Sequence, residues 1–136
     1  MIDHIGISVG SIARATEFYL KALTPLGYGI MMQVSAEETR HGAAIGFGAP
    51  GEAPDFQSGK PSFWVGESGE AGGPLHIAFV APIRATVDAF YLAAMKAGGT
   101  DNGPPGLRPH YHANYYAAFV LDPDGNNIEA VCHRPE

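Results

Sequence analysis

The sequence has 136 residues, 46% of them hydrophobic and 16% charged, a composition typical of one globular domain, expected over residues 1–136. The net charge of −6 argues against nucleic acid or an anionic membrane surface as a partner. Cys132 is the only cysteine, so no intrachain disulfide can form, and no apolar run reaches the ~18 residues of a membrane span. We therefore expect a cytoplasmic protein.

The first half of the chain shows strand and helix patterns in turn. Residues 2–9 alternate apolar with small or polar side chains, which predicts a half-buried strand. Ser11 is placed to cap a helix that Pro25 and Gly27 end. Short strands are then expected near residues 29–34, 42–48 and 62–66.

The second half repeats this order. A strand is expected over 75–81 and a helix over about 83–97. Residues 100–113 contain the run Gly103-Pro104-Pro105-Gly106 and are predicted to be a loop, with at most a short strand beside it. The last two strands are expected near 115–121 and 127–132, joined by a tight turn with the sequence Asp-Pro-Asp-Gly-Asn.

A shift of 72 positions aligns the two halves with each other without a gap. His4 falls on His76, and the aromatic and small residues of the first helix fall on those of the second. Phe47 falls on Phe119 in the same register. A repeat of this kind predicts two similar modules, the first over about 1–68 and the second over about 73–136. Equivalent residues of the two modules are expected to meet at a shared centre, where two histidines would suit a metal site.

The β-α-β-β-β repeat, the histidine that opens each first strand and the closing sequence from Asp122 to Glu129 together resemble the vicinal oxygen chelate superfamily. This superfamily includes glyoxalases, bleomycin resistance proteins, fosfomycin resistance proteins and extradiol dioxygenases. The resemblance implies an α+β, glyoxalase-like fold in which both modules form a curved mixed sheet around a central cup. It also implies a homodimer, and one divalent metal ion held by His4, His76 and Glu129.

The resemblance implies a fourth ligand on the last strand of module one in glyoxalase I, where this chain has Phe63 and Trp64. Without a carboxylate there, we expect no glyoxalase I activity. Two imidazoles and one carboxylate leave up to three open positions, which a substrate with vicinal oxygens can occupy. These ligands suit iron, manganese, zinc or nickel alike, so the identity of the metal stays open.

Five further residues are candidates for the site. His112 and Tyr115 carry groups suited to acid/base chemistry, although a loop histidine is often merely solvated and tyrosine favours strands. If Phe119 faces the cup, strand alternation places Tyr115 on the same face. The candidates for substrate binding are Arg108 as an anion anchor, Trp64 as an apolar wall or a core residue, and His41 at the rim.

The sequence thus predicts a metal-dependent enzyme that acts on a small oxygen-rich substrate, as a dioxygenase, lyase, isomerase or thiol transferase. The alternative is a metal-free protein that sequesters a small molecule in the cup. Three predicted ligands favour the enzyme, since a sequestering protein needs none of them.

Overall fold

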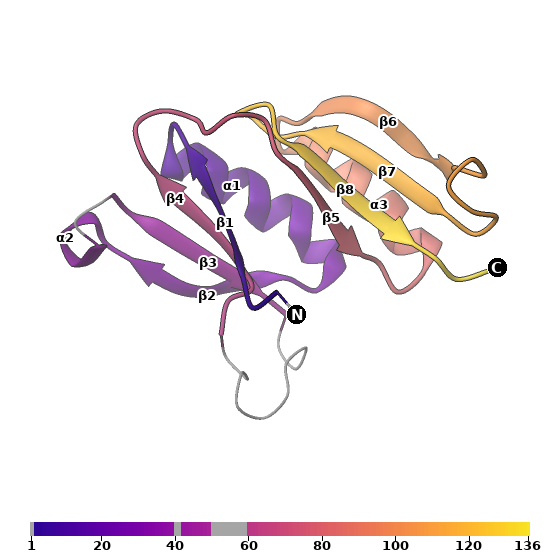
Figure 1. Cartoon of the computed structure of the whole chain (residues 1–136), viewed down its shortest axis with the longest axis horizontal. Helices are drawn as coiled ribbons and strands as arrows, with labels where there is room; N and C mark the ends of the chain where they lie inside the picture. The colour runs from indigo at the N-terminus through magenta and orange to yellow at the C-terminus, as the bar shows by residue number, and fades with distance from the viewer. Residues whose placement is uncertain (1, 40–41, 50–59) are drawn as a thin grey trace.

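The computed structural model describes residues 2–39, 42–49 and 60–136. Two four-stranded mixed sheets lie side by side, each with a long helix on one face (Figure 1). The strands are β1 (Ile5–Val9), β2 (Gly29–Val34), β3 (Ala44–Gly48), β4 (Phe63–Glu67), β5 (His76–Val80), β6 (Thr100–Leu107), β7 (Tyr116–Leu121) and β8 (Asn127–Cys132). The helices are α1 (Ile12–Leu23), α2 (Ala36–Thr39) and α3 (Arg84–Lys96), with a 3₁₀ turn over Thr24–Leu26.

The two sheets have the same topology, which confirms the α+β fold of paired modules. The strand order is β1-β4-β3-β2 in one sheet and β5-β8-β7-β6 in the other, with the first and last strands of each module parallel. β1 and β5 form no ladder with each other, so the two sheets are not closed into one. Among the residues that the structure describes, no helix combines the length and apolar character needed to cross a membrane.

The core lies between the sheets and the two long helices, which pack against each other. The buried face of α1 includes Phe18 and Tyr19, and that of α3 includes Phe90, at 0% exposure each. Phe63 joins the two modules, because its ring contacts Tyr19 on α1 and Phe79 on β5 at centroid distances of 5.0 and 5.5 Å. The opposite face of each sheet is therefore the one available to a ligand.

Module two differs from the prediction between residues 100 and 113. The segment with two prolines is not a loop but the eight-residue edge strand β6, paired with β7 through two register shifts. Pro104 and Pro105 lie between the paired positions Gly103 and Gly106, where no ladder hydrogen bond is required of them. Proline is tolerated at such edge and bulge positions, so composition alone misassigned this strand.

The short helix α2 is an element that the periodicity did not predict. Ser35 and Glu38 form a capping box at its start, in which Glu38 Oε2 accepts from Ser35 N at 2.9 Å and Ser35 Oγ accepts from Glu38 N at 3.4 Å. The Ser-x-x-Glu spacing was the available signal for this helix.

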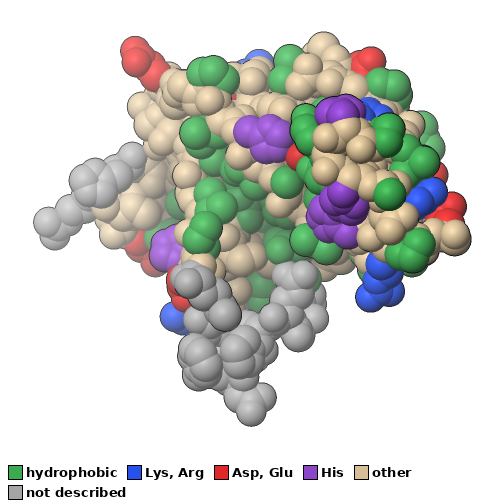
Figure 2. Space-filling view, turned by 45° about the vertical axis from the view of Figure 1, so that its right-hand side comes forward, with side chains coloured by type: hydrophobic (Ala, Val, Ile, Leu, Met, Phe, Trp, Pro, Cys, Tyr) green, Lys and Arg blue, Asp and Glu red, His purple; other side chains and the backbone are tan. Residues whose placement is uncertain are grey.

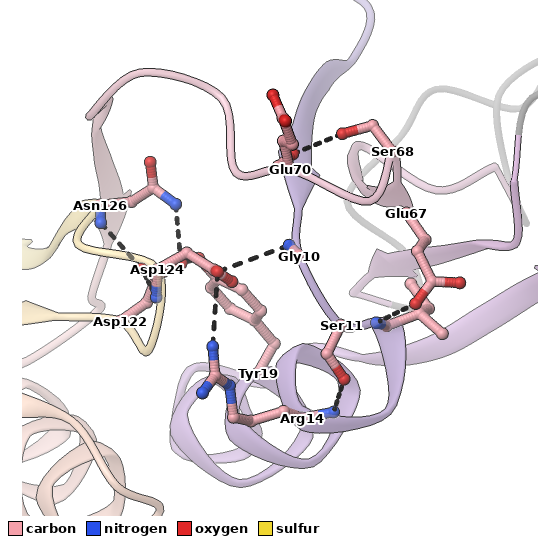
Figure 3. Close-up of polar contacts among 11 residues, drawn as sticks. Gly10, Ser11, Arg14, Tyr19, Glu67, Ser68, Glu70, Asp122, Asp124 and Asn126 are labelled. Atoms are coloured by element: carbon pink, nitrogen blue, oxygen red, sulfur yellow. Dashed lines mark hydrogen bonds and ion pairs between the residues drawn. The ribbon is translucent and has the colours of Figure 1, made fainter.

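The Asp-Pro-Asp-Gly-Asn turn between β7 and β8 connects the modules (Figure 3). The buried Asp122 carboxylate accepts hydrogen bonds from the Tyr19 hydroxyl at 2.5 Å, from Asn126 Nδ2 at 2.9 Å, and from the backbone N–H groups of Asp124 and Asn126 at 2.9 and 2.8 Å. Asp124 Oδ1 accepts from Gly10 N at 3.4 Å, just before α1. Burial, with the nearby Asp122 carboxylate, raises the pKa of Tyr19 well above its usual range, so the phenol stays a donor.

Candidate functional site

The candidate site lies on the face of the second sheet that is opposite α3. Ile128, Ala130 and Cys132 on β8 point into the core, so strand alternation places Glu129 on the other face. Glu129 pairs with Ala78 on β5 and with Phe119 on β7. Tyr115 lies on this same face, whereas the Tyr116 hydroxyl bonds Asp88 of α3 at 2.7 Å on the opposite one.

The Glu129 carboxylate is buried, with 2% of its side chain exposed, and has two polar partners. Tyr115 Oη donates to Oε1 at 2.6 Å, and His76 Nε2 lies 2.9 Å from Oε2. Burial, followed by the hydrogen bond to Glu129, raises the pKa of Tyr115 to about 12. Tyr115 is therefore a protonated donor at neutral pH, and it holds Glu129 in place.

We expect Tyr115→Phe to lower the free energy of unfolding by about 1 kcal/mol, because one hydrogen bond to a buried carboxylate is lost. The raised pKa means that this stabilisation is present below the ordinary tyrosine pKa of about 10 and is lost as the pH rises through about 12. Urea unfolding at neutral and alkaline pH measures both effects. Tyr111→Phe is the matched control, since the Tyr111 side chain is 60% exposed. An equal loss of stability in both variants would contradict the prediction.

A chain of amide groups orients His76. Asn127 Nδ2 lies 2.8 Å from His76 Nδ1, and Asn102 Nδ2 donates to Asn127 Oδ1 at 3.1 Å. With an amide donor at Nδ1, the neutral imidazole carries its proton on Nε2 and donates to Glu129. When the Asn127 amide turns round, its oxygen accepts from Nδ1–H instead, and the Nε2 lone pair is free for a metal. The site thus has a row of hydrogen bonds that runs from β6 across β8 to the first residue of β5.

His112 forms a second cluster beside Tyr115. His112 Nε2 lies 2.7 Å from His133 Nδ1, and the backbone N–H of Asn114 donates to His112 Nδ1 at 3.1 Å. The rings of His112 and His133 contact the Tyr115 ring at centroid distances of 5.4 and 5.1 Å. The predicted candidates His112 and Tyr115 are therefore brought together, one ring away from Glu129.

His4 lies elsewhere in the chain. It is exposed, bonded through Nδ1 to Asp3 Oδ1 at 2.7 Å, and it lines a pocket of about 260 Å³ together with Val80 and other residues at the end of β5. His76 starts β5, and the segment before it reaches the end of β1 through the bond from Gly72 N to Ser8 O at 3.1 Å. β1 and β5 therefore run in opposite directions where they meet, and the two equivalent histidines lie at opposite ends of this boundary.

This placement bears directly on whether the chain fits a metal. In residues 2–39, 42–49 and 60–136, no group of three or more His, Cys, Asp and Glu side chains is arranged to hold one. The chain brings together His76 and Glu129, but His4 does not join them. A single copy therefore does not supply the predicted set of three ligands.

The position equivalent to Glu129 in module one is Trp64. β1 pairs Gly6 with Trp64, and β5 pairs Ala78, the repeat equivalent of Gly6, with Glu129. Phe63 instead is 2% exposed and belongs to the core. No carboxylate occupies this position. A Cβ at Gly46 would clash with Pro61 Cγ and lie 3.2 Å from the Trp64 ring, so only glycine fits between these two side chains.

The strand register also shows that Phe47 and Phe119, which the 72-residue shift aligns, are not structurally equivalent. Phe47 pairs with Phe63 on the core face, whereas Phe119 pairs with Glu129 on the opposite face. Phe119 is therefore equivalent to Gly46, because the two modules differ by one residue at this point.

The remaining predicted residues lie as follows. The Arg108 guanidinium lies over the Phe119 ring at 5.6 Å, on the face of Glu129, and donates to Pro104 O at 2.7 Å. His41 lies outside the described residues. Sequence reasoning missed Asn127 and His133. Both lie an even number of residues from Glu129, so strand alternation along β8 predicts that they point to the same face of the sheet, and this was the signal that could have found them.

Comparison with known proteins identifies the class to which this fold belongs. The profile of the Glyoxalase/Bleomycin resistance protein/Dioxygenase superfamily matches residues 1–130. The chain therefore belongs to this superfamily, which includes enzymes such as glyoxalase I and dioxygenases. No curated protein matches the sequence.

Solved structures agree with this assignment. A glyoxalase/bleomycin resistance protein from Albidiferax ferrireducens T118 is 26% identical, with a TM-score of 0.67 over 97% of both chains. A glyoxylase/bleomycin resistance protein/dioxygenase domain from Frankia sp. EAN1pec is 16% identical, with a TM-score of 0.71 over 98% of both chains. Glyoxalase I from Zea mays is 17% identical with a TM-score of 0.71; the match covers 99% of this chain but 45% of the maize chain. The last two likenesses concern the fold alone.

Proposed function

We propose that this protein is a metal-dependent enzyme that acts on a small oxygen-rich substrate bound through vicinal oxygens. The observation that carries the proposal is the buried Glu129 carboxylate with His76 Nε2 at 2.9 Å from it. A buried acid is costly unless a cation or donors compensate it, and imidazole with carboxylate forms two of the three ligands of a facial site. Iron, manganese, zinc and nickel all suit such ligands.

The third ligand, His4, is proposed to come from a second copy of the chain. His4 and His76 lie at opposite ends of the boundary between the modules, so a two-fold partner that packs against this boundary sets its own His4 beside the first copy's His76 and Glu129. Ile2 and Val80, at 76% and 74% exposure, are apolar side chains close to His4 that such a partner would cover. The homodimer would then hold two equivalent sites.

The side chains around this site have separate tasks in the proposal. A bound divalent ion supplies Lewis-acid chemistry, or redox chemistry if it is iron. Tyr115 orients Glu129, His112 belongs to the hydrogen-bonded cluster beside Tyr115, Arg108 anchors an anionic group, and Trp64 of the copy that supplies His4 provides an apolar wall. Because Trp64 stands where a fourth ligand would be, we do not expect glyoxalase I activity; the reaction is that of a dioxygenase, lyase, isomerase or thiol transferase.

A subunit-mixing experiment tests the shared site. His4→Ala and Glu129→Gln should each lose bound metal, as measured by elemental analysis after loading with zinc and removal of excess. Mixed dimers keep one intact site, built from Glu129 of one copy and His4 of the other. An equal mixture with free exchange should therefore recover about a quarter of the wild-type zinc. No recovery in mixed dimers, with wild type loaded fully, would show that the site is not shared.

A metal-free binding protein is the second candidate function. The pocket of about 260 Å³ beside His4 supports it, since its walls include the apolar side chains of Ile5, Ile77 and Phe79. Absence of stoichiometric zinc, iron, manganese and nickel from wild-type protein after loading would favour this function over the enzyme.

A further inference from the structure

The hydrogen bonds of His112 determine which of its nitrogens carries the proton. The backbone N–H of Asn114 can only donate, and it points to His112 Nδ1 at 3.1 Å. Nδ1 must therefore offer a lone pair, and a neutral His112 carries its proton on Nε2. Because the donor is a backbone amide, it cannot turn round as a side-chain amide can.

The tautomer of His112 in turn determines which nitrogen of His133 carries its proton. His112 Nε2 lies 2.7 Å from His133 Nδ1, so Nε2–H of His112 donates to Nδ1 of His133. His133 in its neutral form then carries its own proton on Nε2. Among the described residues, His133 Nε2 has no hydrogen-bond partner of its own, and the side chain is exposed.

His133 lies on the face of the candidate site. It directly follows β8 and, by strand alternation, points to the same face as Asn127 and Glu129. Its ring contacts the Tyr115 ring edge-on at a centroid distance of 5.1 Å, and the Tyr115 hydroxyl donates to Glu129. Histidine side chains are exposed at several separate places on this side of the molecule (Figure 2). One tyrosine ring therefore separates the free N–H of His133 from the buried carboxylate.

We propose that His133 presents Nε2–H as a fixed hydrogen-bond donor to an oxygen acceptor of the ligand, a carbonyl or hydroxamate-like oxygen, and that His112 is the positioning residue which sets its tautomer. The proposal rests on the proposed function for the location of the ligand, and it assigns a role to a residue that the sequence did not single out. A neutral imidazole N–H polarises a carbonyl oxygen without giving up its proton, which suits a donor whose tautomer is locked.

The same geometry argues against a metal ion between His112 and His133. A metal on His112 Nε2 would need that lone pair, which forces the proton onto Nδ1. The Nδ1 proton would then face the N–H of Asn114, a donor against a donor. The pair is therefore better suited to hydrogen bonding than to metal binding.

Nitrogen-15 NMR of the metal-free protein at about pH 8, above the usual pKa range of imidazole, tests the tautomer directly. Both His112 and His133 should show the Nε2–H form. In His112→Ala, His133 should shift toward a mixture of tautomers, and His112→Gln, whose amide can donate, should restore the Nε2–H form. A His133 in the Nδ1–H form in wild type, or one that His112→Ala leaves unchanged, would overturn the proposal.

Acetohydroxamic acid, a probe with two vicinal oxygens that is mainly uncharged near neutral pH, tests the contact with the ligand. Added to the metal-free protein, it should shift the Nε2–H signal of His133. Its affinity should fall about tenfold in His133→Ala, as expected for one lost hydrogen bond, and should stay unchanged in His110→Ala, a neighbouring loop histidine. Equal affinity in wild type and His133→Ala would overturn the role of His133. Neither NMR measurement requires bound metal, so failure of the metal site is distinguishable from failure of this proposal.

Discussion

Asp122→Ala is expected to lower the free energy of unfolding by about 3–5 kcal/mol. The carboxylate is 4% exposed and accepts hydrogen bonds from Tyr19, Asp124 and Asn126. Removing it leaves these donors buried without an acceptor, and the Tyr19 bond is one of those that join the modules. Urea denaturation followed by circular dichroism measures the change.

Two variants separate the contributions. Tyr19→Phe removes only one donor and leaves the turn satisfied, so we expect a loss of about 1–2 kcal/mol. Asp122→Asn keeps an acceptor oxygen but adds an N–H group among existing donors, and should fall between the two. If the Asp122→Ala protein were as stable as Tyr19→Phe, the hydrogen bonds from Asp124 and Asn126 to Asp122 would add nothing to the free energy of unfolding.

Phe63→Ala is expected to cost about 3–5 kcal/mol, because a cavity opens where the two modules meet. The Phe63 ring is 2% exposed and contacts the rings of Tyr19, Phe47 and Phe79. Differential scanning calorimetry or urea unfolding measures the loss.

Conservative and exposed substitutions serve as controls for this effect. Phe63→Leu keeps most of the volume and should cost about 1 kcal/mol, and Leu92→Ala, at a position 60% exposed on α3, should stay within about 0.5 kcal/mol. A Phe63→Ala variant within 1 kcal/mol of wild type would place Phe63 on the ligand face and not in the core.

The local pattern predicted those elements that depend on neighbouring residues. Ser11 does cap α1, whose Arg14 N donates to Ser11 Oγ at 3.4 Å, and the alternation at residues 5–9 gives β1. The same reasoning failed for β6, because its prolines indicate a loop unless one knows that they lie between paired positions of an edge strand.

The repeat predicted the two modules, but the prediction that equivalent histidines of both modules meet was wrong. Equivalent residues were expected to meet at a shared centre, and Phe18 and Phe90 do both lie in the common core. His4 and His76 do not meet, because the boundary strands β1 and β5 run in opposite directions and so separate equivalent ends. A sequence repeat therefore shows which residues hold the same place in each module, but it does not show how far apart these residues lie.

By itself, the sequence determined the order of the two long helices and of the strands other than β6, the two modules and the superfamily. Each of these depends on periodicity, capping and a short turn motif that are readable within a few residues. Only the tertiary structure decided that Trp64 stands where Glu129 has its counterpart, that Tyr115 and His76 converge on Glu129, and that His133 pairs with His112. These relations depend on strand register and on residues far apart in the sequence, such as His76 and Glu129, which are 53 positions apart. A one-residue shift in register moves a side chain to the opposite face of the sheet, and no local pattern specifies that shift.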